Sequence, residues 1–424
     1  MKKVLLIDGC RTPFLKSGTD YIDILSYELA QYAIEGLLLK TGITKNDIDQ
    51  VILGNVVSNI LTPNVAREAS IAAGLDYETH CSTVSQACIS GNKAISNSFN
   101  EIKLGHSDLI IAGGVESISD TPILFRKKMR KKLFLSQKVK SIVDLTKFIF
   151  SLNIKDFIPV KPKVTEYLTG RTMGEDCEIL VSRYNITRDD QDKYSLRSHK
   201  LAFDAQKNGF LDDIFPLEIK PKFKKIKFDN GIRGNTSIES LKKLKPAFDS
   251  RYGTLTAGNS SFLTDGAAMS MLASENYCNK NNIIPKSEII DYVFTGQSIE
   301  QDLLLGPAYA ISRLLDKTNL KLKDIDVFEI HEAFAGQVLS NLKCLESNTF
   351  SKTKLNIDDP VGEIDINKLN LWGGSMSIGH PFGATGSRLL NTASNRLIRE
   401  NGNYAIISAC AAGGHGHAML IKKY

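Results

Sequence analysis

Runs of apolar residues alternate along this chain with segments in which apolar residues recur every three or four positions. Residues 109–114 and 404–410 are almost wholly apolar or small, which predicts central strands buried on both faces. Each run follows a segment with helical spacing, around Ile95 in the first case and Leu390 in the second. Helices that alternate with buried strands predict an α/β architecture with right-handed crossovers.

One sequence pattern occurs twice. Residues 44–55 carry a short helical entry, an apolar strand and a polar residue at the strand end, and residues 321–331 repeat this order. Such self-similarity predicts two related halves that pack against each other. We assign residues 1–119 plus 249–274 to the N-terminal half and residues 275–424 to the C-terminal half.

Residues 120–248 differ from both halves and are predicted to form an inserted loop domain. They are rich in Lys, poor in strand patterning and contain a helical pattern over 188–209. From 126 to 140 there are eight Lys or Arg and no acidic residue, and an amphipathic helical pattern follows. Such a stretch suits an anionic membrane surface, which residues 126–152 would touch. The alternative is a solvated charge run beside a helix that docks on the protein itself.

Composition restricts the class of protein. With 424 residues, 42% hydrophobic and 24% charged, the chain matches an ordinary globular protein. No apolar run approaches the roughly 20 residues of a membrane-spanning helix, and the opening residues break after four apolar positions, so we expect a cytoplasmic protein. Seven cysteines without paired spacing argue against a disulfide framework and a cysteine-rich metal site. No nucleic-acid partner is expected.

Cys88 is the first of four reactive residues that stand beside small residues at a predicted strand or helix end. It precedes a helical pattern with Gly91 one turn in, so its sulfur is expected at a helix N-terminus, where the helix dipole favours the thiolate. Such a cysteine can attack a thioester or carbonyl and hold the acyl group covalently. The plainer alternative is an inert buried cysteine, which is common.

Two further residues are candidates for moving protons. His380, in Gly379-His380-Pro381-Phe382-Gly383, opens the matching helix of the second half and can exchange a proton with Cys88, although a histidine before proline is often only a turn residue. Cys410 closes an apolar strand before Ala411-Ala412-Gly413-Gly414. A second thiol there suits removal of a carbon-bound proton beside backbone N–H groups; the alternative is a tight turn with a buried thiol.

His331 ends the predicted strand 327–330 as a hydrogen-bond donor or the holder of a water. An imidazole pair from His331 and His380 around one thioester oxygen would polarise that oxygen. A metal site of His331 and Glu332 is disfavoured because no further ligand follows at helical spacing. The four residues together predict an acyl-transfer site.

Eight short motifs are spread over the whole chain. In chain order they are Arg11-Thr12-Pro13-Phe14, 84–91, 112–117, 243–248, 260–266, 331–335, 373–386 and 410–416. In content and order they resemble the motifs of the thiolase family, and within it the long-chain 3-ketoacyl-CoA type, the β-chain of fatty-acid trifunctional complexes. The resemblance implies a thiolase fold, with two βαβαβαββ halves in a five-layer αβαβα arrangement and an inserted loop domain.

The resemblance also implies a role for each candidate residue. Cys88 would be the acylated nucleophile, His380 its base, and Cys410 the acid/base at the acetyl carbon. One oxyanion hole would use His331 and His380, and the other the backbone N–H groups of Cys88 and Ala412. The residues implied to line the substrate and coenzyme A are Met173, Gly174, Ala257, Ser261 and Phe334. No metal and no cofactor are implied, because coenzyme A thioesters are the substrates.

The implied reaction is cleavage of a 3-ketoacyl-CoA by coenzyme A into acetyl-CoA and a shortened acyl-CoA. An acetyl-CoA acetyltransferase running toward acetoacetyl-CoA is the alternative. A ketoacyl synthase is disfavoured because that class normally has His in place of Cys410, and a non-catalytic lipid carrier or membrane scaffold is disfavoured by the four reactive residues. The family implies a homodimer or tetramer, and the trifunctional type a hydratase/dehydrogenase α-chain as partner.

Overall fold

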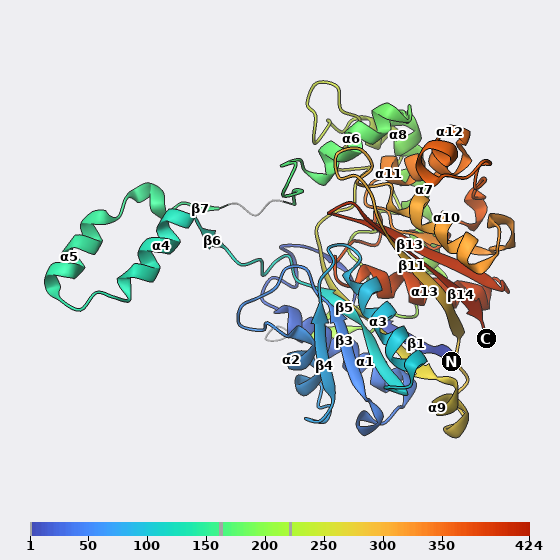
Figure 1. The fold of residues 1–424 in the computed structure, drawn as a ribbon, viewed down its shortest axis with the longest axis horizontal. Coiled ribbons are helices and arrows are strands. Elements are labelled where there is room, and N and C mark those ends of the chain that lie inside the picture. Colours follow the sequence, from blue (N-terminus) through green and yellow to red (C-terminus); the bar gives the residue numbers. More distant parts are fainter. Residues whose placement is uncertain (1, 161–163, 220–222) are drawn as a thin grey trace.

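The computed structural model describes residues 2–160, 164–219 and 223–424. Its body is built on one ladder of ten hydrogen-bonded strands, in the order β12-β13-β14-β11-β1-β10-β5-β3-β4, with β2 paired to β10 (Figure 1). The strands are β1 Val4–Arg11, β2 Leu15–Lys16, β3 Gln50–Gly54, β4 His80–Val84, β5 Leu109–Glu116, β10 Thr264–Ser274, β11 Ser287–Gly296, β12 Val327–Ile330, β13 Tyr404–Ala411 and β14 His415–Lys423.

The ladder consists of two related halves. In the first, β3 lies parallel to β4 and β5, and β10 runs antiparallel to β5 and β1. In the second, β12 lies parallel to β13, and β14 runs antiparallel to β13 and β11. The counterpart of β4 is reduced to a single bridge between Phe328 and Leu369. The halves join where β1 pairs antiparallel with β11, so the predicted repeat is confirmed.

Helices cover the ladder in layers. The outer face of the first half carries α1 Ser26–Thr41 and α2 Val65–Ala72, and that of the second half carries α10 Gly306–Thr318 and α11 Ala335–Glu346. Between the halves lie α3 Ser90–Leu104 and α13 Thr385–Arg399, which contact each other. Alternate residues of one strand serve different layers: Ile111 packs with α1, whereas Ile110 packs with α3 and α13. This is the predicted five-layer arrangement.

The segment between β5 and β10 holds the helices of the insertion and two short strand pairs. They are α4 Lys127–Ser136, α5 Ile142–Ser151, α6 Met173–Arg183, α7 Arg188–Lys207, α8 Ile238–Lys242, and the pairs β6 Leu124–Phe125 with β7 Pro159–Val160 and β8 Leu217–Ile219 with β9 Lys224–Ile226. Helix α7 fits the pattern predicted over 188–209. Helices α6 and α7 pack on α11, which places the insertion beside His331. The remaining short helices are α9 Glu275–Lys280 and α12 Asn348–Phe350.

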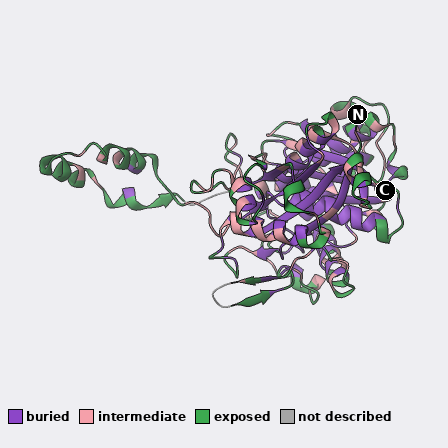
Figure 2. Ribbon diagram, turned by 90° about the horizontal axis from the view of Figure 1, so that it is seen from below, coloured by how far each residue is buried: buried purple, intermediate pink, exposed green. Residues whose placement is uncertain are grey.

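Residues 124–160 form an arm that extends away from the body (Figure 1). The arm is almost entirely exposed (Figure 2), with Ile142 at 82% and Phe150 at 88% exposure. The sequence left open whether this amphipathic helix docks on the protein itself; in the structure α5 packs beside α4 within the arm and extends away from the body (Figure 1). No helix in the described ranges is long and apolar enough to cross a membrane.

Helix α13 is buried despite its polar sequence, and Glu329 of β12 compensates two of its cations. The Arg396 guanidinium lies 2.8 Å from the Glu329 carboxylate and that of Arg388 lies 3.5 Å from it. All three side chains are at most 1% exposed. A buried cation without an anion is costly. The Glu329 carboxylate therefore allows α13 to keep two arginines buried in the central layer.

We predict that Glu329→Ala lowers the free energy of unfolding by about 3–5 kcal/mol, because it leaves two buried guanidinium groups with one anion fewer. Urea denaturation followed by circular dichroism measures the shift. The matched control is Glu400→Ala, which removes the other carboxylate of Arg396 at a side chain that is 30% exposed; we expect a loss below about 1 kcal/mol. Equal losses in both variants would contradict the assignment.

Candidate active site

Cys88 lies in a sharp turn between β4 and α3. Ala87 has a φ of +45°, a left-handed conformation that costs a non-glycine residue about 1–3 kcal/mol. The turn is fixed by Ser90, whose hydroxyl accepts from the Gln86 N–H at 2.7 Å and donates to the Ala87 carbonyl at 2.7 Å. Cys88 is thereby presented, half-buried, just before the first turn of α3.

His380 reaches the same place from the other half of the molecule. Its backbone N–H donates to the Thr264 hydroxyl at 3.0 Å, and the Gly383 N–H donates to the Glu116 carboxylate at 3.1 Å. The Gly383 carbonyl lies only 2.5 Å from where a Cβ on Gly91 would stand. Since no larger residue fits at Gly91, this close approach holds the His380 loop against the helix that follows Cys88.

His331 and His380 lie side by side, with ring centroids 3.9 Å apart. The Nδ1 of His331 is 2.8 Å from the Ser375 hydroxyl, and that of His380 is 2.7 Å from the Thr385 hydroxyl. Within the described residues, neither buried Nε2 has a hydrogen-bond partner. Burial lowers the pKa of His331 well below its usual value and that of His380 to about 3, and the Arg388 cation lowers both further. The pair therefore consists of neutral rings with two Nε2 atoms available to a ligand.

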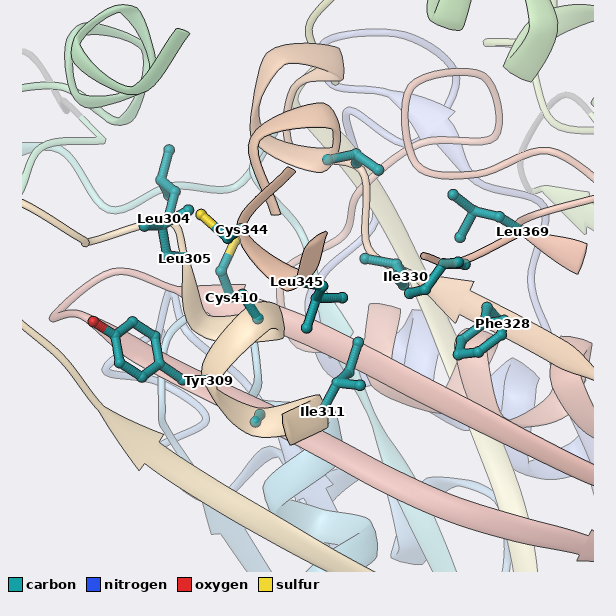
Figure 3. Close-up of a cluster of buried hydrophobic side chains, with 14 of the residues drawn as sticks. Leu304, Leu305, Tyr309, Ile311, Phe328, Ile330, Cys344, Leu345, Leu369 and Cys410 are labelled. Atoms are coloured by element: carbon teal, nitrogen blue, oxygen red, sulfur yellow. The ribbon is translucent and has the colours of Figure 1, made fainter. Parts of the chain in front are cut away.

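Cys410 ends the apolar part of β13 and is 1% exposed. Figure 3 shows it within the cluster of buried side chains that contains Cys344 and Leu345. The following turn passes through Gly413 and Gly414, whose φ values of +82° and +67° favour glycine. The Gly413 N–H donates to the Glu166 carboxylate of the insertion at 2.7 Å.

The two thiols influence each other, but neither is activated in the free site. Burial raises the pKa of Cys88 to about 11; the backbone N–H groups of Ala412 and Cys88, which lie at the sulfur, lower it less than burial raises it. Burial also raises the pKa of Cys410, and the neighbouring Cys88 raises it further. Burial therefore opposes the effect that the sequence predicted for the helix end at Cys88, and in the free protein burial has the larger effect on the pKa of this thiol.

Most residues predicted to line the substrate gather around two aromatic rings. Met173 and Gly174 begin α6, and a Cβ on Gly174 would stand 2.3 Å from Phe248. The ring of Phe248 lies 5.8 Å, centroid to centroid, from that of Phe334. Ser261 is joined to the same segment through its N–H, which donates to the Ala333 carbonyl at 2.9 Å. Ala257 is exposed on the turn before it.

Beside Phe248 the surface is hollowed by about 560 Å³. Arg171 and Arg251 border the hollow, together with Glu175, Glu178, Ile179, Asp249 and Ser250. Neither arginine was identified from the sequence, because each is a single cation in a segment without a motif. Within the described ranges, no group of three His, Cys, Asp or Glu side chains is arranged to hold a metal ion.

Sequence reasoning also missed Glu116, at the end of β5. Its buried carboxylate accepts from the N–H groups of Val56, Val57 and Gly383 and from the Asn55 amide, at 2.9–3.2 Å. Burial raises its pKa to about 7, although the backbone donors oppose this. The available signal was a single carboxyl residue at the end of an apolar strand.

Comparison with known proteins assigns this chain to a family. The model of the thiolase N-terminal domain matches residues 4–276, and that of the thiolase C-terminal domain matches residues 283–423. The chain belongs to the thiolase family. It is 44% identical over its full length to the mitochondrial trifunctional enzyme subunit beta of Homo sapiens, covering 89% of that protein. It is 45% identical to a probable 3-ketoacyl-CoA thiolase of Caenorhabditis elegans, covering all of this chain and 95% of the relative.

A solved structure agrees with the sequence relatives. Human mitochondrial 3-ketoacyl-CoA thiolase in complex with CoA superposes on this thiolase with a TM-score of 0.84 at 30% identity, covering 100% of this chain and 98% of the other. The thiolase fold is therefore confirmed, and the protein is an acyltransferase of this family.

We predict that Glu116→Gln lowers kcat roughly 10- to 100-fold, because an amide cannot accept from all four donors and the His380 loop shifts by a fraction of an ångström. Steady-state kinetics with acetoacetyl-CoA measures this, and KM for CoA should change little. The matched control is Asp326→Asn, a half-buried carboxylate that also accepts from two backbone N–H groups, those of Asn403 and Tyr404, but precedes β12, at the end of that strand opposite to His331. A similar loss in the control would assign both effects to stability.

Proposed function

We propose that this thiolase cleaves 3-ketoacyl-CoA with coenzyme A, giving acetyl-CoA and an acyl-CoA shortened by the acetyl unit. The proposal rests on one observation above all: the Ala412 N–H, from the loop of Cys410, lies at the sulfur of Cys88. Two thiols from opposite halves can then act on one substrate, with two neutral imidazoles beside them. The full-length likeness to 3-ketoacyl-CoA thiolases supports the same direction of reaction.

In the first half-reaction the Cys88 sulfur bonds to the keto carbon while its proton passes to Nε2 of His380. The keto oxygen becomes negative and is held by the backbone N–H groups of Cys88 and Ala412. The carbon–carbon bond then breaks, its electron pair leaves as the enolate of acetyl-CoA, and Cys410 protonates the enolate carbon. The enolate oxygen lies at the Nε2 atoms of His331 and His380.

In the second half-reaction the thiol of a new coenzyme A attacks the acyl group on Cys88. The proton of that thiol passes to the Cys410 thiolate. The shortened acyl-CoA then leaves, and the departing Cys88 sulfur regains its proton from Nε2 of His380. The same two oxyanion holes serve both halves. Because all reactive groups of the free site are neutral, charge develops only during reaction, where fixed donors stabilise it most.

The hollow beside Phe248 is our proposed seat for the phosphate end of coenzyme A. Arg171 and Arg251 supply positive charge there, although Arg171 also pairs with Asp176 at 2.7 Å. The pantetheine chain would pass Met173, Gly174 and the Phe334 segment toward Cys88. A homodimer or tetramer and a hydratase/dehydrogenase partner chain remain proposals drawn from the family.

We expect Cys88→Ala to abolish acyl-enzyme formation and to lower thiolysis by roughly 10⁴-fold or more, because the variant lacks the thiol that would hold the acyl chain covalently. Cys410→Ala should still form the acyl-enzyme from an acyl-CoA but fail in carbon–carbon bond cleavage. Intact-protein mass spectrometry and thiolysis of four-, eight- and sixteen-carbon 3-ketoacyl-CoA esters measure both steps. Cys81→Ala, a half-buried cysteine on β4, is the control that should stay active. An acyl group found on another residue contradicts the proposal, and rates confined to the four-carbon ester favour the acetyltransferase.

We also propose that the arm contacts an anionic membrane surface. Each exposed Lys or Arg contributes about 1 kcal/mol near such a surface, and the exposed Ile142 and Phe150 can enter the interface. The protein should sediment with phosphatidylglycerol vesicles at low salt and be released at high salt. The double variant Ile142→Glu/Phe150→Glu should not sediment, whereas Leu39→Glu, at a 73% exposed position on α1, should. Absence of binding by the unaltered protein at low salt excludes the membrane contact.

A further inference from the structure

The Ser375 hydroxyl has two polar partners among the described residues. One is Nδ1 of His331 at 2.8 Å, and the other is Nη2 of Arg388 at 3.1 Å. All three residues are buried, with Ser375 and His331 fully so. The hydroxyl makes no hydrogen bond to a carbonyl or carboxylate oxygen of the described residues, so the three groups must distribute their hydrogens among themselves.

Counting the hydrogens leaves one arrangement that satisfies both contacts of the Ser375 hydroxyl. A guanidinium can only donate, so the Ser375 oxygen accepts from Arg388. The serine then has one hydrogen to donate, and Nδ1 of His331 is its only acceptor. If Nδ1 instead carried a hydrogen, the serine oxygen would accept twice and its own hydrogen would be buried without a partner, which costs about 1–3 kcal/mol.

We propose that Ser375, held by Arg388, is a positioning residue that fixes His331 as the tautomer with its hydrogen on Nε2. This inference rests on the proposed function and deepens it: the unpartnered Nε2 of His331 is a hydrogen-bond donor committed in advance to the enolate oxygen. An Nε2 lone pair would repel that oxygen instead.

His380 is held differently. Its Nδ1 faces the Thr385 hydroxyl, which lies 2.9 Å from the Pro381 carbonyl. Thr385 therefore has an acceptor for its own hydrogen and is able to accept one from Nδ1, which leaves a lone pair on Nε2 of His380. Two rings 3.9 Å apart are thus divided into a donor and a base by the hydroxyl behind each.

Burial is the largest cause that keeps the His331 ring neutral. The neighbouring His380 ring and the Arg388 cation both face His331 and disfavour its protonation further. The nearest carboxylates are engaged elsewhere: Glu329 pairs with Arg388 and Arg396. Glu332 accepts from Tyr194, Ser198, Asn370 and the Met376 N–H. A neutral ring whose Nδ1 accepts must carry its hydrogen on Nε2.

The first test uses the unaltered protein. Long-range nitrogen–proton correlation spectra of ¹⁵N-histidine-labelled protein distinguish the tautomers, and the His331→Asn variant identifies the His331 signals by their loss. We expect a protonated Nε2 and an unprotonated, hydrogen-bonded Nδ1 across the pH range of activity. A signal pattern with the hydrogen on Nδ1 overturns the proposal, whether or not the protein is an active thiolase.

The second test is a double-mutant cycle in acetoacetyl-CoA thiolysis. Ser375→Ala should lower kcat roughly 10- to 100-fold, less than the roughly 100- to 1,000-fold loss of a whole oxyanion-hole donor. In the His331→Asn background the same change should alter kcat less than about threefold, because an amide NH₂ donates without a tautomer to fix. Equal losses in both backgrounds, or no loss in either, overturn the proposal.

The matched control is Ser377→Ala. Ser377 is equally buried two residues further on, but its hydroxyl bonds Ser198 and Gly374 rather than His331. Its loss should leave kcat within about threefold of the unaltered enzyme in both backgrounds. The proposal is overturned if Ser377→Ala lowers kcat as much as Ser375→Ala does and if both losses are the same with His331 and with Asn at position 331. That result would show a merely structural role for both serines. If the unaltered enzyme lacks thiolysis altogether, the proposed function fails while the spectra still decide the tautomer.

Discussion

The contact between the Glu116 carboxylate and the Gly383 N–H joins the two halves at the point where chemistry is expected. The same carboxylate also holds the loop after β3 through the Val56 and Val57 N–H groups. The His380 loop can come this close only because a glycine stands at 383: a Cβ there would lie 2.4 Å from the Gly54 carbonyl and 2.5 Å from that of Val115. A buried carboxylate that collects backbone donors is therefore the constraint that sets His380 relative to Cys88.

The internal repeat explains why a site arises there. Helices α3 and α13 are equivalent in the two halves and form the central layer, and Cys88 and His380 come just before their first turns. Strands β12 and β13 end at the same edge of the second half and bring His331 and Cys410. The duplicated architecture thus contributes the same structural positions twice, but with different side chains, and a symmetric scaffold yields an asymmetric set of two thiols and two imidazoles.

The sequence predicted the parts of this picture that depend on local pattern. Apolar runs located β5 and β13, the duplicated segments revealed the repeat, and small residues beside Cys88, His380 and Cys410 marked the reactive loops. The sequence could not predict long-range burial: the high pKa of the Cys88 thiol and the low pKa of both imidazoles come from packing between segments that are separated along the chain. Glu116 and Ser375 were overlooked because their importance lies in which donors face them, and no spacing rule encodes that.

Burial raises the pKa of the two thiols and lowers the pKa of the two imidazoles, and both shifts favour the neutral form of the group. A dry site of neutral groups stabilises developing charge only if its donors already point the right way, because solvent cannot reorient to help. The direction of each hydrogen then matters as much as the position of each ring. Arg388 is fixed by Glu329, Ser375 by Arg388 and His331 by Ser375. The ion pair in the central layer thus determines, through Arg388 and Ser375, the orientation of the hydrogen on Nε2 of His331. The buried ion pairs of α13 then serve the reaction as well as the stability of the fold.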